Sequence, residues 1–290
     1  MEQDAFSSPP INSLPEECVS HVISLTSPRD ACIFSLASTG FRSAVDSDTT
    51  WQRFLPSDYV SILSRAVDPV AFSSKKDLFF KLCERHVLID GGKMSFGLDR
   101  SSGAKCYMIS AKALEIAHVD APQRYWRWVS LRDSRFDGVA ELIEVCWLEI
   151  TGKIDSRALS AKTRYGAYLV YKLTETACGL GCPIGKIKQQ ASVSIGRQIS
   201  KSTVCLQTFH ERYIGKRFRK WRVPHETVEF SNGGAGTPKE RGDGWKEVEL
   251  GTFYNENGED GVVEMSLREI NGLYWKSGLI VQGIEIRPKH

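Results

Sequence analysis

Residues 142–150 read Leu-Ile-Glu-Val-Cys-Trp-Leu-Glu-Ile, a run rich in β-branched and aromatic side chains that is typical of a β-strand. Further stretches of the same character follow residue 104 and are separated by Gly, Asn or Asp turns: 168–173, 191–195, 203–209, 245–250, 262–267 and 279–286. No regular alternation of strands with helices accompanies them, which argues against a parallel sheet. The C-terminal part is therefore predicted to be an antiparallel β-sandwich of the jelly-roll kind.

The N-terminal part has helical spacing instead. The acids Glu16 and Glu17 favour a helix start, and apolar residues then recur three and four positions apart. The run Ser27-Pro28-Arg29-Asp30 is typical of an N-cap followed by a first helical turn, and a third helix follows Gly40. The sequence thus predicts an α+β protein with a three-helix module at 10–56, a helical linker at 57–99 and the β-domain at 100–290.

Charge also divides the chain into two parts. Its 290 residues carry a net charge of +3, and 41% of them are hydrophobic, which is ordinary globular composition. Residues 1–55 hold seven acidic and three basic side chains, so the N-terminal module is acidic and the remainder is basic. The overall balance argues against a protein that mainly coats nucleic acid or an anionic membrane.

The expected compartment is the nucleus and the cytoplasm. No apolar run approaches the length of a bilayer span, and the first ten residues lack the pattern of a secretory signal. Eight cysteines lie mostly in apolar stretches, and no Asn-x-Ser/Thr acceptor site occurs. Both features suit a reducing compartment, so the cysteines are expected to be free thiols.

The N-terminal module is expected to dock onto another protein, because three short helices cannot bury all their apolar faces. Its motifs are Leu14–Ser20, Ser27–Ala31, Ser38–Phe41 and Asp48–Pro56, and in this order they resemble an F-box from end to end. The resemblance implies binding to a Skp-type adaptor and, through it, to a cullin. The residues expected at that contact are Leu14, Pro15, Val22, Pro28 and Ala31. The alternative is an autonomous helical bundle.

The C-terminal part resembles a second family. The motifs include PQRYWRW at 122–128, Tyr168–Leu173, Asp243–Trp245 and Trp275–Val281. They are similar to those of the phloem protein 2 or Nictaba-type lectin domain over roughly residues 105–290. An F-box joined to such a domain is an arrangement known from plants.

The resemblance also implies where a sugar would bind. The family's proposed site uses an early aromatic residue, the first Trp of the PQ-Y-W motif and two late acids, and these positions fall on His118, Trp126, Val262 and Glu269. His118 replaces an aromatic platform, Val262 replaces an acid, and Arg124 is an extra residue within the motif. We therefore expect weak or altered glycan binding through His118, Trp126 and Glu269. Burial of Trp126 or Trp128 in the core is the alternative.

Other chemistry has little support in the sequence. The Gly-rich stretch 179–186 departs from a phosphate loop in spacing and lacks the Ser or Thr that would hold Mg²⁺. Cys178 and Cys182 have no second ligand pair at zinc spacing, so no metal and no cofactor are expected. The basic run at 216–222 is compatible with nuclear import or with a solvated loop.

Three functional interpretations remain. The first is a non-catalytic substrate-recognition subunit of a Skp-cullin-F-box ubiquitin ligase, whose sandwich captures a protein or glycoprotein substrate. The second is an intracellular lectin in which the F-box is secondary. The third is a glycosidase that uses two of the many Glu residues of the sandwich.

Overall fold

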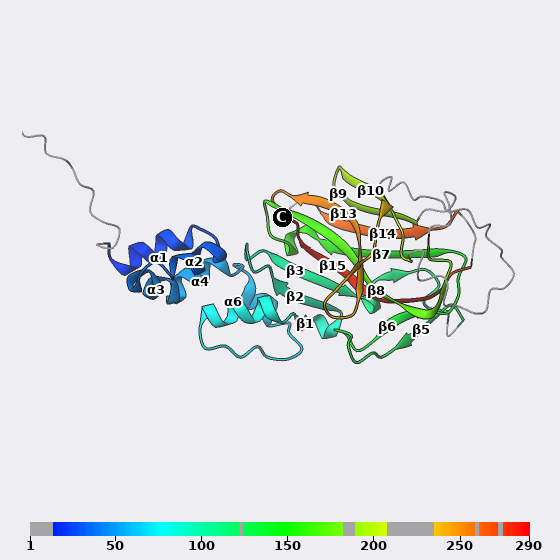
Figure 1. Ribbon diagram of the computed structural model, residues 1–290, viewed down its shortest axis with the longest axis horizontal. Coiled ribbons are helices and arrows are strands. Elements are labelled where there is room, and N and C mark those ends of the chain that lie inside the picture. Colours follow the sequence, from blue (N-terminus) through cyan, green and yellow to red (C-terminus); the bar gives the residue numbers. More distant parts are fainter. Residues whose placement is uncertain (1–13, 122–123, 182–188, 208–234, 259–260, 272–274) are drawn as a thin grey trace, which may run out of the picture. The chain divides into compact units, whose positions relative to one another are not determined.

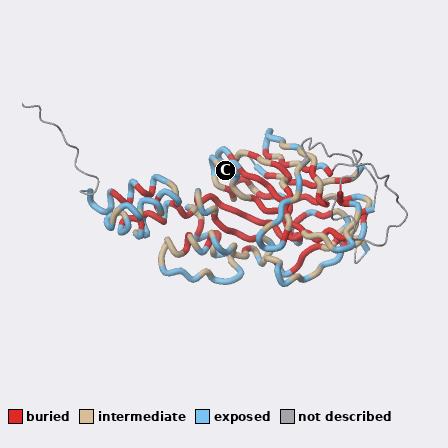
Figure 2. Tube along the Cα trace, viewed as in Figure 1, coloured by how far each residue is buried: buried red, intermediate tan, exposed pale blue. Residues whose placement is uncertain are grey.

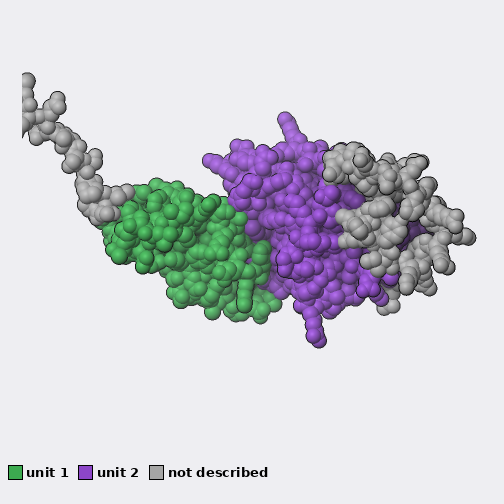
Figure 3. All heavy atoms as spheres, in the orientation of Figure 1, with its two compact units in different colours: residues 1–87, 97–105 green, residues 88–96, 106–290 purple. Residues whose placement is uncertain are grey.

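The computed structural model describes residues 14–121, 124–181, 189–207, 235–258, 261–271 and 275–290. The basic run at 216–222 and residues 182–188 of the Gly-rich stretch lie outside the described residues. The chain forms two compact units (Figure 3): residues 1–87 with 97–105, and residues 88–96 with 106–290.

The first unit is helical (Figure 1). Its helices are α1 (Glu16–Ser24), α2 (Pro28–Phe34), α3 (Thr39–Asp46), α4 (Asp48–Phe54), α5 (Tyr59–Leu63) and α6 (Lys75–Glu84). The third predicted helix is in fact two, α3 and α4, because Ser47 between them has extended backbone geometry. Asp48 is the first residue of α4.

Serine caps fix several of the helix starts. The Ser27 hydroxyl accepts a hydrogen bond from the Asp30 amide at 3.1 Å, as the sequence predicted. Ser38 accepts one from the Phe41 amide at 3.2 Å, and Ser74 caps α6 in the same way. These local bonds begin helices that are too short to be stable on their own.

Trp51 is the centre of the helical core. Its side chain is fully buried, and the indole N–H donates to the Val45 carbonyl at 2.6 Å. The ring also packs against Phe79 and Phe80 of α6, with centroids 5.1 and 5.2 Å away. Helix α6 thus completes a core that α1 to α4 alone could not fill.

The second unit consists mainly of two β-sheets (Figure 1). In the described residues the larger sheet has the order β1-β2-β3-β15-β8-β13-β12, with β6 also on β15 and β5 on β6, and the smaller has the order β11-β10-β9-β14-β7-β4. The larger sheet contains β1 (Val87–Ile89), β2 (Met94–Leu98), β3 (Lys105–Ser110), β5 (Trp126–Val129), β6 (Val139–Leu142), β8 (Thr163–Cys178), β12 (Lys239–Glu240), β13 (Lys246–Asn255) and β15 (Ser277–Pro288). The smaller contains β4 (Glu115–Ile116), β7 (Leu148–Asp155), β9 (Gln189–Ile195), β10 (Gln198–Val204), β11 (Ala235–Gly236) and β14 (Val262–Glu269).

The two sheets pack face to face through alternate side chains of their strands. A Cβ atom on Gly152 of β7 would lie 3.0 Å from Ile284 and 3.6 Å from Ile109, which belong to the opposite sheet. In β14 the buried side chains Val263, Met265 and Leu267 have the same parity and therefore face this interior. Most strands of the unit are accordingly buried along much of their length (Figure 2).

The outer face of the larger sheet carries an apolar cluster. It is made of Met108, Phe136, Val139, Val170, Trp245 and Ile280. The Trp245 indole donates to the Asp133 carbonyl at 2.9 Å, and the Lys172 ammonium lies 4.8 Å from the ring centroid. The loop that follows β5 is therefore held against the sheet by Trp245.

The predicted α+β class, with helices first and mostly antiparallel sheets after them, is confirmed. Two details differ. Residues 87–98, placed by the sequence in the helical linker, contain β1 and β2, and the run 142–150 is not one strand. β6 ends at Leu142 and β7 begins at Leu148, with a single bridge between Val145 and Lys276 in the interval.

Candidate functional site

The helical unit exposes apolar side chains that its core does not use. Of the predicted adaptor contacts, Leu14, Pro15 and Val22 are exposed, whereas Pro28 and Ala31 are buried. Pro28 and Ala31 thus lie in the interior of the unit and are not exposed for direct contact with a partner. The adaptor-binding role of the five residues stays a prediction.

Further exposed apolar residues lie at the end of α1, on α2 and in the turn after α2. They are Leu25, Ile33, Phe34 and Leu36, and Leu36 is 79% exposed. The spacing of the second helix predicts Phe34 and Leu36 on its apolar stripe with Ala31, whereas the structure leaves both exposed. The available signal was that the helical module contains more apolar residues than a core of this size can bury.

His118 is placed at the surface, at the end of β4. It is exposed and has a backbone φ of 64°, a conformation that is uncommon for a residue with a side chain. Its ring lies 5.3 Å from that of Tyr125, and the Arg124 guanidinium lies 5.2 Å from the same Tyr ring. The structure thus brings together His118, Tyr125 and the extra residue Arg124.

Trp126 lies in the interior, with only 2% of its surface exposed. Its indole N–H donates to the Ala117 carbonyl at 3.0 Å, so the ring ties β5 to the segment that carries His118. Trp128, two residues further along β5, is 46% exposed. Of this pair, Trp126 is therefore the ring that is buried in the core. Trp128 is the exposed aromatic side chain of β5.

Glu269 is also buried, with 3% of its surface exposed. It has the same parity in β14 as Met265 and Leu267, and its register partner is the buried Leu148. Its carboxylate forms an ion pair with the equally buried Lys276, whose ammonium also donates to the Cys146 carbonyl at 2.9 Å. A sugar hydroxyl would have to displace Lys276 to reach this carboxylate.

Val262 has the opposite parity to Glu269 in β14 and is 56% exposed, on the outer face of the smaller sheet. Of the four positions taken from the resemblance, His118 and Val262 are therefore at the surface, and Trp126 and Glu269 are inside. The predicted carbohydrate role of His118, Trp126 and Glu269 stays a prediction.

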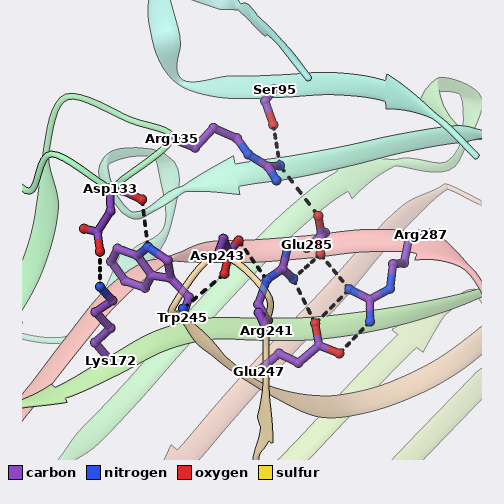
Figure 4. Close-up of polar contacts among 10 residues, drawn as sticks. All are labelled: Ser95, Asp133, Arg135, Lys172, Arg241, Asp243, Trp245, Glu247, Glu285 and Arg287. Atoms are coloured by element: carbon purple, nitrogen blue, oxygen red, sulfur yellow. Dashed lines mark hydrogen bonds and ion pairs between the residues drawn. The ribbon is translucent and has the colours of Figure 1, made fainter. Parts of the chain in front are cut away.

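A network of charged side chains on the outer face of the larger sheet was not predicted (Figure 4). Arg241 donates to Glu285 at 2.5 Å and to Glu247 at 2.8 Å. Arg287 donates to Glu247 at 2.6 Å and to Glu285 at 2.7 Å. Arg135 lies 3.6 Å from Glu285 on the other side. The five side chains come from β13, β15 and two loops, so no local sequence pattern identifies them.

The arginines keep the buried carboxylates of this network ionised. Burial alone would raise the pKa of Glu285, but the hydrogen bond and charge of Arg241, with Arg135 and Arg287, lower it to about 2. Burial likewise opposes ionisation of Glu247, and the Arg287 hydrogen bond outweighs it, so the pKa of Glu247 is lowered. A fully paired network of this kind fixes the loops on the sheet.

The described residues offer little to a metal or a membrane. They contain no group of three or more His, Cys, Asp or Glu side chains placed to hold a metal ion. Their seven cysteines are free thiols. No helix among them is long and apolar enough to cross a membrane.

Comparison with known proteins matches both parts of the chain. The F-box domain model matches residues 11–53, and the phloem protein 2 model matches residues 104–288. The chain is 45% identical over 280 residues to F-box protein At2g02240 of Arabidopsis thaliana, covering 96% of this chain and 80% of that one. It is 42% identical over 285 residues to F-box protein VBF of the same plant, covering 95% of this chain and 99% of that one. The chain therefore belongs to the family of F-box proteins that carry a phloem protein 2 domain.

Proposed function

We propose that this protein is the substrate-recognition subunit of a Skp-cullin-F-box ubiquitin ligase. An F-box domain implies binding to a Skp-type adaptor. The observation that carries the proposal is the exposed apolar surface of the helical unit: Leu14, Val22, Leu25, Ile33, Phe34 and Leu36. We call these six residues the F-box surface. The protein itself performs no chemistry in this role and acts as an adaptor.

The F-box surface suits a protein partner that covers apolar side chains. Leu14 precedes α1 and Val22 lies in its last turn, while Phe34 and Leu36 follow at the end of α2, where the Phe34 ring stacks on Phe41 at 6.0 Å. Each aliphatic side chain that the partner covers is worth about 1–3 kcal/mol. A handful of such contacts is sufficient for a stable complex.

Co-purification with a Skp-type adaptor tests the proposal. In the full chain, Leu14→Ala combined with Pro15→Ala, and separately Leu36→Asp, should abolish capture, because each change weakens a contact or places a charge in the interface. Val60→Asp is the matched control, since Val60 is a comparably exposed apolar residue of α5 outside the F-box. Unchanged capture by both F-box variants, or equal loss in Val60→Asp, would contradict the proposal.

A second candidate function is that of a lectin whose F-box is secondary. Exposed aromatic side chains on the sandwich, including Trp128, favour it, because sugars stack their apolar faces on such rings. Binding of the full chain to a glycan array in the absence of the adaptor tests it. In either role we place the protein in the nucleus and the cytoplasm, which localisation of a fluorescent fusion would check.

A further inference from the structure

Two hydroxyl side chains in the described part of the chain are directly followed by proline: Ser27-Pro28 and Thr237-Pro238. A proline at this position is the feature that proline-directed protein kinases recognise. Proline lacks a backbone N–H, and it disfavours a helical conformation for the residue before it, so the acceptor is held extended. The two candidate acceptors differ in their surroundings, and the difference decides which of them a kinase can reach.

Ser27 is closed to a kinase by its role in the helical unit. Pro28 is buried as the first residue of α2, so its ring is not available to a kinase pocket. The Ser27 hydroxyl accepts a hydrogen bond from the Asp30 amide at 3.1 Å and donates one to the Asp30 carboxylate at 2.7 Å. A phosphate on Ser27 would disrupt this cap and lie against a carboxylate of like charge.

Thr237 lies where the chain passes from one sheet to the other. It follows β11, an outermost strand of the smaller sheet, and precedes β12, an outermost strand of the larger sheet, among the strands that the structure describes. Each of these strands has only two residues, so few ladder hydrogen bonds hold the segment in place. Thr237 is exposed, Pro238 is half-buried, and the Thr237 hydroxyl has no hydrogen-bond partner among the described residues. A kinase can therefore take up this segment in an extended conformation.

The charges around Thr237 accommodate a phosphate. Lys239 follows two residues later, which is the same-face spacing of an extended chain. It is exposed and forms no ion pair with a carboxylate of the described residues. Continuing the β12–β13 register by two residues puts Thr237 opposite Glu249, whose carboxylate is already held by Lys289 at 2.7 Å. Lys239 is therefore available to pair with a phosphate on Thr237.

We propose that Thr237 is a phosphorylation site for a proline-directed protein kinase and that Lys239 binds the phosphate. The kinase transfers the γ-phosphoryl group of ATP: a bond forms between Thr237 Oγ1 and the γ-phosphorus, the bond from that phosphorus to the bridging oxygen breaks, and ADP leaves. The hydroxyl proton passes to the catalytic carboxylate of the kinase. The modification adds a charge of about −1.5 to −2 at this edge of the sandwich at pH 7. It is independent of the proposed function.

Labelling of the full chain with ATP, Mg²⁺ and a proline-directed kinase tests the inference, with one cyclin-dependent and one mitogen-activated protein kinase used in parallel. Because Ser8 also precedes a proline and lies outside the described residues, every preparation carries Ser8→Ala. Mass spectrometry should find phosphate on Thr237, formed about tenfold or more faster than on Ser27. Thr237→Val should remove this phosphate, and Pro238→Ala should slow its formation by about tenfold or more. Near-ultraviolet circular dichroism confirms that each protein is folded.

Unfolded controls separate the effect of the sequence from that of the fold. Synthetic peptides covering residues 22–32 and 232–242 should both be labelled, because each contains an acceptor before a proline. Protection of Ser27 in the full chain then results from its burial in the helical unit. For the phosphate contact, a phosphorus NMR titration should give the phosphothreonine a lower second pKa than in the same protein carrying Lys239→Gln, since a nearby cation favours the dianion.

Three results would overturn the phosphorylation site: no phosphate on Thr237 with either kinase, labelling of Ser27 in the folded chain as fast as that of Thr237, or undiminished labelling of Thr237 in Pro238→Ala. An unchanged second pKa in the Lys239→Gln protein would overturn the role of Lys239.

Discussion

The buried pair Glu269–Lys276 offers the sharpest test of how the sandwich is built. Both side chains are about 1% exposed, and the Lys276 ammonium has the Cys146 carbonyl as its further acceptor. Removing one partner of such a pair leaves an uncompensated charge in the interior, which costs about 3–5 kcal/mol. For a domain of this size, that loss lowers the melting temperature by about 6–20 °C.

We therefore expect Glu269→Gln and Lys276→Met each to lower the melting temperature by that amount. The double variant Glu269→Leu/Lys276→Met should recover most of the stability, because it removes both charges and leaves apolar groups of similar size. Glu264→Gln is the matched control, since Glu264 lies on the same strand with the opposite parity and is half exposed. Its effect should stay within about 0.5 kcal/mol.

Thermal and urea unfolding of the full chain, followed by near-ultraviolet circular dichroism, measure these differences. A Glu269→Gln protein as stable as the wild type would refute the structural role of the pair. If that stable variant also lost glycan binding, Glu269 would be a ligand contact, as the family resemblance implies.

Three further predictions concern other parts of the chain. Because the pKa of Glu285 is lowered from 4.5 to about 2, its ionised form stabilises the fold above pH 4.5, and this stability should be lost as the pH falls from 4.5 towards 2. Urea midpoints at several pH values measure the loss, and Glu285→Gln should reduce the slope of stability against pH. Gly283→Ala should destabilise by about 3 kcal/mol or more in urea unfolding, because the new Cβ would overlap a backbone carbonyl oxygen, whereas Gly242→Ala, with open space around it, should be neutral. Burial raises the pKa of the Cys83 thiol to about 12, so at pH 8 iodoacetamide should label the exposed Cys18 much faster, as mass spectrometry would reveal.

Sequence reasoning succeeded where the signal is local. Ser27 caps α2 through a bond to the amide three residues away, so the pattern and the structure coincide. The long strands β8 and β15 have enough β-branched and aromatic residues to be recognised at once. Strand β10, Gln198–Val204, was only partly predicted, because its residues are largely polar and only the last of them, Val204, is buried.

The candidate site was harder to predict because its partners are distant in the sequence. The buried position of Glu269 was available in principle, since Val263, Met265 and Leu267 give its parity in β14. The pattern could not identify Lys276 as the partner of Glu269, because Lys276 lies beyond the strand. Its charge compensates that of the buried carboxylate. The row formed by Glu149, Arg268 and Gln190 needs the register of three strands and so appears only in the folded structure.

The motifs that identify the phloem protein 2 domain are largely those that hold it together. Trp126 and Trp245 are buried, and each donates its indole N–H to a backbone carbonyl of another segment. Substituting either ring by Ala would remove a large core side chain, which typically costs about 3–5 kcal/mol and disturbs any site nearby. Lost glycan binding in a Trp126→Ala protein therefore cannot assign that ring to a ligand. Exposed positions such as His118 and Trp147 can vary without loss of the fold, so differences in ligand choice among such domains should be sought there.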